Sequence, residues 1–232
     1  MKRIETAELL DTDSGTPAEI ATSLADLRRI NRWLGGMPTS ELLLQRAFHR
    51  TRSRSLSLLE VAAGSGDVPK LVRRRLQKSG LYVDFTLLDR AASHLRDGVR
   101  ENSTAAVVGD ALALPFQDQS FDLVGCSLFV HHLSPPQVVQ FVAEALRVCR
   151  VAVLINDLVR HPVHLALVYA GMPLYRGRIT RHDAPASVRQ SYTLDEMRAL
   201  LQQSSAAEVE IHSHFLFRMG AVAWKNQGFS KN

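Results

Sequence analysis

An acidic residue near the end of an apolar run, followed by a turn of small residues, is the strongest chemical signal in this sequence. The run Leu58–Val61 contains Glu60, and the turn 62–66 reads Ala-Ala-Gly-Ser-Gly. Small side chains let a ligand approach the backbone closely. If a helix begins after the turn, its first N–H groups lack partners within the helix and face that ligand. The pattern predicts a nucleotide-type cofactor loop after a first strand.

The spacing within this loop argues against two common nucleotide sites. Gly64 and Gly66 are followed by Val68 and Pro69, without the third glycine of the dinucleotide motif, and no P-loop lysine follows. A carboxylate at Glu60 would repel a pyrophosphate but would attract a cation. S-adenosylmethionine fits this loop because it carries an α-amino group and a sulfonium but no phosphate.

Three later segments repeat the order of apolar strand and polar turn. Segment 83–89 ends in Asp89, segment 107–111 ends in Gly-Asp-Ala, and segment 114–124 leads through a fourth strand to the loop that begins at Ser127. Asp89 has two interpretations, an acceptor for both ribose hydroxyls of a nucleoside or a cap of the next helix. Asp110 is either a ligand-binding acid or an ordinary turn acid.

In this order the segments resemble the class I S-adenosylmethionine-dependent methyltransferases, whose loop reads acid-x-Gly-x-Gly-x-Gly. Ala62 stands where the family has its first glycine, and the resemblance covers residues 56–157 well and the rest loosely. The resemblance implies S-adenosylmethionine as cofactor, with the adenine lying against the turn at 109–111. The residues it assigns to cofactor binding are Glu60, Ala62, Gly64, Gly66, Asp89, Arg90, Asp110, Ala111 and Ser127.

Alternating strands and helices predict an α/β fold with a parallel sheet covered on both faces. We expect strands at 56–62, 82–88, 105–108, 121–126 and 151–156, and helices at 68–79, 91–101 and 135–148. Ser134 is expected to cap the last of these helices, and Thr193 with Glu196 forms a capping box for a later one. The resemblance implies a Rossmann-like sheet of seven strands, mostly parallel, with the last strand antiparallel.

The chain is expected to form one domain of 232 residues in four parts. Residues 1–52 hold N-terminal helices at 18–34 and 39–48 that cover the cofactor pocket, after a polar segment, 1–17, that is expected to be loose. Residues 56–157 form the cofactor-binding core. Residues 158–190 are an insertion after the fifth strand, at the family's lid position, and residues 193–225 form a closing helix and strand pair.

Several residues are candidates for acceptor chemistry. His131 and His182 are candidate general bases, and because His131 and His132 are adjacent, at most one of them is expected to face the pocket. Asp157 either caps the lid helix or holds a substrate hydroxyl, while Arg181 and Trp33 are candidate substrate contacts. No metal site is expected, since His161 and His164 have no third ligand at a fitting spacing.

The overall composition leaves several functions open. A net charge of +5 and a pI near 9.6 favour an RNA-modifying methyltransferase as one alternative, but no aromatic residues interleave with the arginines. Ala62 favours a second alternative, a non-catalytic domain that binds S-adenosylmethionine weakly. The loop spacing argues against a third alternative, a nicotinamide-dependent oxidoreductase. Resemblance to enzymes of bacterial secondary metabolism, and more loosely of quinone biosynthesis, suggests O-methylation of a small aromatic, polyketide or quinone-like acceptor.

The expected location is the cytoplasm, with no nucleic-acid partner and no membrane span. The first residues are not followed by an apolar signal core. No apolar run approaches the roughly 20 residues that a bilayer requires. Cys126 and Cys149 lie in apolar surroundings, which indicates reduced core residues and no disulfide framework.

Overall fold

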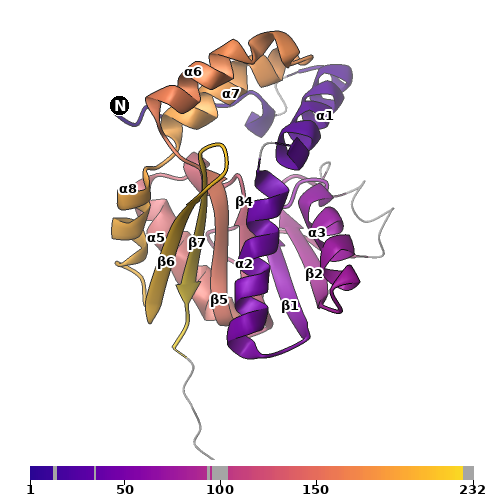
Figure 1. Cartoon of the computed structure of the whole chain (residues 1–232), viewed down its shortest axis with the longest axis vertical. Coiled ribbons are helices and arrows are strands. Elements are labelled where there is room, and N and C mark those ends of the chain that lie inside the picture. The colour runs from indigo at the N-terminus through magenta and orange to yellow at the C-terminus, as the bar shows by residue number, and fades with distance from the viewer. Residues whose placement is uncertain (13–14, 34, 93–94, 96–103, 227–232) are drawn as a thin grey trace, which may run out of the picture.

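Seven strands form a single sheet in the order β3-β2-β1-β4-β5-β7-β6 (Figure 1). The computed structural model describes residues 1–12, 15–33, 35–92, 95 and 104–226. Every neighbouring pair is parallel except those that contain β7, which runs antiparallel to β5 and β6, as predicted. The strands are β1 (Ser55–Val61), β2 (Tyr82–Asp89), β3 (Ala105–Val108), β4 (Phe121–Ser127), β5 (Cys149–Leu158), β6 (Glu208–His214) and β7 (Arg218–Trp224).

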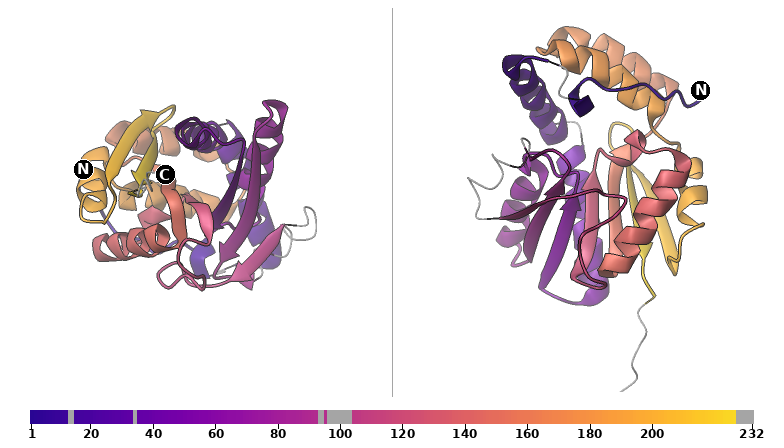
Figure 2. Two further views of the ribbon diagram at one scale, coloured as in Figure 1. Left: turned by 90° about the horizontal axis from the view of Figure 1, so that it is seen from below. Right: turned by 180° about the vertical axis from the view of Figure 1, so that it is seen from behind.

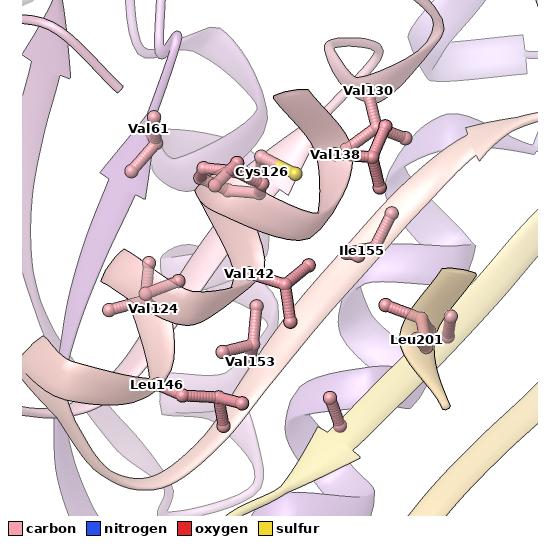
Figure 3. Packing of buried hydrophobic residues seen from close by; sticks show 14 of the residues in the cluster. Val61, Val124, Cys126, Val130, Val138, Val142, Leu146, Val153, Ile155 and Leu201 are labelled. Carbon is pink, nitrogen blue, oxygen red and sulfur yellow. The ribbon is translucent and has the colours of Figure 1, made fainter. Parts of the chain in front are cut away.

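Helices cover both faces of this sheet (Figure 2). Along β1, Leu58 packs into one buried cluster and Leu59 into the other, because successive strand residues point to opposite faces. α5 (Pro135–Val148) and α8 (Leu194–Leu201) cover the face of Leu59. Figure 3 shows Val142 and Leu146 of α5 in that cluster, near Val153 of β5. α2 (Gly36–Thr51) and α3 (Asp67–Lys78) cover the opposite face.

A third layer lies beyond the carboxyl ends of the parallel strands (Figure 1). It consists of α1 (Pro17–Trp33), α6 (Pro162–Ala170), α7 (Arg178–Gln190) and the short 3-10 helices η1 (Leu10–Thr12) and η3 (Met172–Leu174). A further 3-10 helix, η2 (Val130–His132), follows β4. The Asp26 carboxylate of α1 accepts hydrogen bonds from the N–H groups of Arg176 and Gly177, both at 2.9 Å. The predicted insertion and the first helix therefore form one cap.

Residues 1–12 are ordered against α7, which corrects the expectation that they are loose. The Asp183 carboxylate accepts hydrogen bonds from the N–H groups of Leu9 and Leu10, at 2.9 and 3.1 Å. Nearer the start, the Ile4 N–H donates to the Arg189 carbonyl at 3.1 Å. The polar composition of this segment hid its role, because hydrogen bonds of its backbone and of the Arg3 and Glu8 side chains attach it, and not an apolar face. We call residues 1–12 the N-terminal strap.

Of the two N-terminal helices, only α1 lies over the carboxyl ends of the strands. α2 runs along the sheet, where the Asn156 side-chain amide donates to the Gly36 carbonyl at 2.7 Å. The predicted helix at 91–101 falls mostly outside the described residues. Across the described part of the chain, no helix is long and apolar enough to cross a membrane.

Candidate cofactor and acceptor site

The turn after β1 is built on left-handed backbone. φ is +53° at Ala62, +54° at Gly64 and +69° at Gly66. A Cβ atom at Gly66 would lie 2.7 Å from Cδ1 of Leu87, so this position has no room for a side chain. α3 begins at the next residue, Asp67, and the N–H groups of its first turn lie beside the loop. Ala62 holds a backbone conformation that residues with a Cβ usually avoid. The loop thus keeps its glycine-type geometry despite the alanine.

Glu60 is a buried carboxylate beside this loop, with 7% of its surface exposed. Gly125 of the neighbouring β4 makes room for it, since a Cβ there would lie 2.9 Å from Oε2 of Glu60. Burial raises the pKa of Glu60 to about 7, and a hydrogen bond with Ser127 offsets part of the effect. A cationic ligand group near Glu60 would stabilise its ionised form.

The acids that end β2 and follow β3 hold backbone turns. Asp89 accepts hydrogen bonds from the N–H groups of Gly64 at 2.8 Å and Ala91 at 2.9 Å. Asp110 accepts one from the N–H of Leu112 at 2.9 Å. Asp89 therefore caps the following turn and lies beside the cofactor loop, and its binding of ribose hydroxyls stays a prediction.

One cavity of about 760 Å³ lies at the carboxyl ends of β1, β2 and β4. β1 and β4 are adjacent, and the chain leaves them toward opposite sides of the sheet. The crevice between two such strands is the topological switch point at which open α/β sheets bind ligands. The volume is in the range of small-molecule sites. Of the predicted cofactor residues, Gly66 alone does not line this cavity. The residues that line it are Glu60, Ala62, Gly64, Asp89, Arg90, Asp110, Ala111 and Ser127.

Large apolar side chains of the cap and of the turn before β7 also line this cavity. They come from α1, α6, the segment before α7 and that turn. They are Leu24, Leu27, Ile30, Leu167, Val168, Tyr175, Leu216 and Phe217. The cavity therefore joins the strand-end acids and the loop to an apolar surface of the cap.

His131 lies between two carboxylates at the cavity wall. Its Nδ1 is 2.6 Å from Oδ1 of Asp157, and its Nε2 is 3.5 Å from Oε1 of Glu8 in the N-terminal strap. Burial alone would lower the pKa of His131, but the charges and hydrogen bonds of the two carboxylates outweigh it and raise the pKa to about 10. His131 is therefore a charged hydrogen-bond donor at neutral pH. This state differs from the free general base that the sequence suggested.

Asp157 positions His131 and takes neither of its two predicted roles. It is 1% exposed and does not line the cavity. Its carboxylate accepts from the backbone N–H of His131 at 3.0 Å as well as from the imidazole. The side chain of His161, and not Asp157, caps α6 by accepting from the Val163 N–H at 3.2 Å.

Three residues on this wall could hold a metal ion, a grouping that the sequence did not indicate. One ligand atom each from Glu8, His131 and His132 lies within 4.8 Å of the other two. Nδ1 of His132 is also 2.9 Å from Oδ2 of Asp11. Imidazole and carboxylate are ligands that zinc accepts, but a metal would first have to displace the proton on Nε2 of His131. Only the fold brings the strap beside the histidines.

Two predicted acceptor residues lie outside the cavity lining. The His182 side chain is 46% exposed, with Nδ1 2.8 Å from Oδ1 of Asp183. Arg181 is exposed and donates from Nε to the Tyr175 carbonyl at 3.0 Å. The basic run belongs to the outer face of α7, whose inner face lines the cavity with Ala184, Ser187 and Val188. The side chain of Trp33, the third candidate, falls outside the described residues.

Two cavity residues carry chemistry that sequence analysis left unassigned. Arg218, the first residue of β7, is 1% exposed, and its Nη2 donates to Oδ1 of Asn31 at 3.1 Å. Burial lowers the pKa of Arg218 to about 10. His164 of α6 has Nδ1 3.0 Å from the Val159 carbonyl, which can only accept, so Nδ1 carries the proton. Neither residue has a local pattern that distinguishes it from the other arginines and histidines.

Comparison with known proteins identifies the core. A family profile described as "Methyltransferase domain" matches residues 58–151. The chain is 38% identical over 100 residues to a ubiquinone/menaquinone biosynthesis C-methyltransferase UbiE of Roseobacter denitrificans, covering 40% of this chain and 38% of that protein. It is 34% identical over 96 residues to a demethylmenaquinone methyltransferase of Thermotoga maritima, covering 40% and 37%. The matched segment spans under two fifths of the length of these relatives.

Solved structures resemble nearly the whole chain. The plantazolicin methyltransferase BpumL, in complex with a pentazolic desmethylPZN analog and SAH, has a TM-score of 0.69 at 13% identity, covering 94% of this chain and 95% of that one. BamL, with a triazolic analog and SAH, has a TM-score of 0.70 at 14% identity, covering 90% and 91%. At such identities the likeness shows the fold. The profile match identifies residues 58–151 as a methyltransferase domain, and with its loop and strand-end acids this core resembles the class I S-adenosylmethionine-dependent methyltransferases.

Proposed function

We propose that this chain transfers the methyl group of S-adenosylmethionine to a small acceptor of aromatic, polyketide or quinone-like character, and that the methylated atom is oxygen. The observation that carries the proposal is the single cavity with two kinds of lining. Strand-end acids and a glycine-type loop form its polar part, and an apolar cap adjoins them. An enclosed apolar chamber beside a cofactor site suits a reaction that must exclude water.

The polar part fits S-adenosylmethionine group by group. Glu60, buried beside the loop, suits the cationic amino acid end of the cofactor. Asp89 lines the cavity, where its carboxylate suits the ribose hydroxyls, and the turn of Asp110 and Ala111 lines the cavity where an adenine would lie. When bound, the cofactor supplies an electrophilic methyl group. The protein then contributes mainly orientation and exclusion of water, which can account for much of the acceleration.

Methylation of carbon is the competing outcome, because matched relatives are named C-methyltransferases. We favour oxygen because the cap encloses an acceptor beside a fixed charged histidine, His131, and a neutral histidine, His164. Such a pair can orient a hydroxyl and accept its proton. Transfer of an isotopically labelled methyl group, followed by NMR of the product, distinguishes methyl bound to oxygen from methyl bound to carbon.

The first experiment is calorimetric titration of the purified protein. We expect S-adenosylmethionine and S-adenosylhomocysteine to bind, and NAD and ATP to give no heat at the same concentrations. The Glu60→Gln variant should bind S-adenosylhomocysteine more weakly, while Asp84→Asn should bind normally, since Asp84 is exposed on β2 outside the cavity. Flat titrations of the wild type with both methionine derivatives would refute the proposal.

Turnover is then tested on phenols, quinols and total RNA with labelled S-adenosylmethionine. Label is expected in the small molecules and not in RNA. Label in RNA alone would show the RNA-modifying alternative, which the basic pI favours. Cofactor binding without transfer to any class would favour the non-catalytic alternative.

A further inference from the structure

We propose that Arg218 is the anion-binding residue of the acceptor site, and that the acceptor carries a carboxylate or another anionic oxygen. The inference rests on the proposed function, because it assigns a substrate class to the apolar part of the same cavity. The positive charge that recognises the acceptor is then one buried guanidinium, and not the exposed basic run of α7.

The first observation is an unsatisfied donor in a buried charged group. A guanidinium carries five N–H donors. Arg218 lines the cavity and is 1% exposed, yet among the described residues its side chain donates one hydrogen bond, from Nη2 to Asn31. Its Nη1 is buried and has no hydrogen-bond partner among the described residues. Buried charges in proteins are paired almost without exception, so an unpaired donor in a residue that lines the cavity indicates a ligand that completes it.

The carboxylate that acts on Arg218 does not supply this partner. Asp157 attracts the guanidinium through its charge. However, Oδ1 of Asp157 accepts from the His131 imidazole and from the Leu158 N–H, and its Oδ2 accepts from the His131 backbone. His131 in turn contacts Glu8 at 3.5 Å. These acids are committed to His131, which leaves Arg218 available to a ligand.

The second observation is the strained turn that precedes Arg218. Leu216 and Phe217 have φ of +53° and +57°, and both line the cavity. Consecutive left-handed residues in a hairpin turn are usually asparagine and glycine, because bulky side chains are strained there. Here two large apolar residues occupy these positions. Strain of this kind concentrates at ligand sites, and this turn places two apolar side chains and then Arg218 on one wall.

The surroundings favour an anion with an apolar body. The ring of Phe217 stacks on that of His164 with centroids 5.2 Å apart, which fixes His164 beside the turn. Burial, with the nearby charge of Arg218, lowers the pKa of His164, so this histidine is neutral and does not compete for the anion. In an apolar enclosure, a charge-assisted hydrogen bond to a guanidinium is strong and can be bidentate.

The test compares acids with their neutral esters. Benzoate, salicylate and 1-naphthoate, each paired with its methyl ester, are titrated into the protein saturated with S-adenosylhomocysteine, and again into the protein without it. We expect at least one acid to bind the wild type roughly ten- to a hundredfold more tightly than its ester, the range for a hydrogen bond to a charged group. Arg218→Met should abolish this preference. The control Arg181→Gln, on the exposed face of α7, should keep it.

A second measurement separates binding from folding. Burial of the Arg218 charge carries a desolvation cost that an apolar side chain of similar length avoids. The melting temperature of ligand-free Arg218→Met should therefore be equal to or above that of the wild type, and its affinity for S-adenosylhomocysteine should be unchanged. A wild type that prefers no acid over its ester, a variant that keeps the preference, or a variant that melts well below the wild type would each overturn the proposal. Failure of the wild type to bind S-adenosylhomocysteine would count against the methyltransferase function and not against the role of Arg218. The titration of the acids and esters without cofactor would still test Arg218.

Discussion

Replacement of Glu60 by glutamine should stabilise the empty protein and weaken its binding of cofactor. The carboxyl is buried, and Ser127 is the single hydrogen-bond partner that acts on its pKa, which burial raises from 4.5 to about 7. Because the folded pKa lies above the unfolded one, folding opposes ionisation of this group. Below pH 4.5 the carboxyl is protonated in both states and has no effect. As pH rises through 4.5 the unfolded state loses its proton first, and stability falls until about pH 7.

The size of the effect follows from this difference in pKa. Each pH unit in this window contributes about 1.36 kcal/mol, so ionised Glu60 destabilises the empty fold by about 3 kcal/mol above pH 7. Glutamine has the same shape and no charge. The difference in unfolding free energy between Glu60→Gln and the wild type should therefore grow in favour of the variant by about 2 to 3 kcal/mol from pH 5 to pH 8.

Urea unfolding measured by circular dichroism at pH 5, 6, 7 and 8 gives these free energies directly. The same series with S-adenosylhomocysteine should reverse the order at pH 8, because the ligand's ammonium group compensates the carboxylate of the wild type only. Wild-type affinity for this ligand should also rise with pH up to about 7, and that of the variant should not. Parallel stability curves for the two proteins in the absence of ligand would refute the reasoning, since they would show that Glu60 is not desolvated.

Three more predictions concern the loop and its wall. His131, whose pKa is raised to about 10, should show an imidazolium NMR signal at pH 8. Its contribution to stability should be lost as pH rises from about 6.5 to 10. A neutral ring at pH 8 would contradict the pairing of His131 with the two carboxylates. Ala62→Gly should raise the unfolding free energy by up to about 1 kcal/mol, because it relieves a left-handed alanine, while Ala63→Gly, the matched control, should lower it. Asp89→Ala should lower the stability of the empty protein by roughly 1–3 kcal/mol and weaken cofactor binding, because two backbone N–H groups lose their acceptor. Urea unfolding and calorimetry check both, and unchanged values for Asp89→Ala would show that its hydrogen bonds are replaced by water.

The local signals in the sequence determined most of the core. The helix from Pro135 to Val148 has the predicted ends, and Ser134 and Thr193 form the capping boxes with Gln137 and Glu196. Strand periodicity and the loop at 60–66 predicted cofactor residues that, except for Gly66, line one cavity. These features depend on interactions within a few residues or on the carboxyl ends of parallel strands, and both are encoded in local order along the chain.

Only the tertiary structure decided the acceptor side. Glu8 meets His131, and Arg218 meets Asn31, across long separations in sequence, and the strap and the hairpin turn carry no local signal of those contacts. The sequence placed the positive charge on Arg181, which the rotation of α7 turns to solvent. Charge state also depends on the tertiary surroundings, since His131 is charged and His164 neutral because of the groups packed around each of them. A histidine's neighbours in space set its chemistry, and its neighbours in sequence do not reveal them.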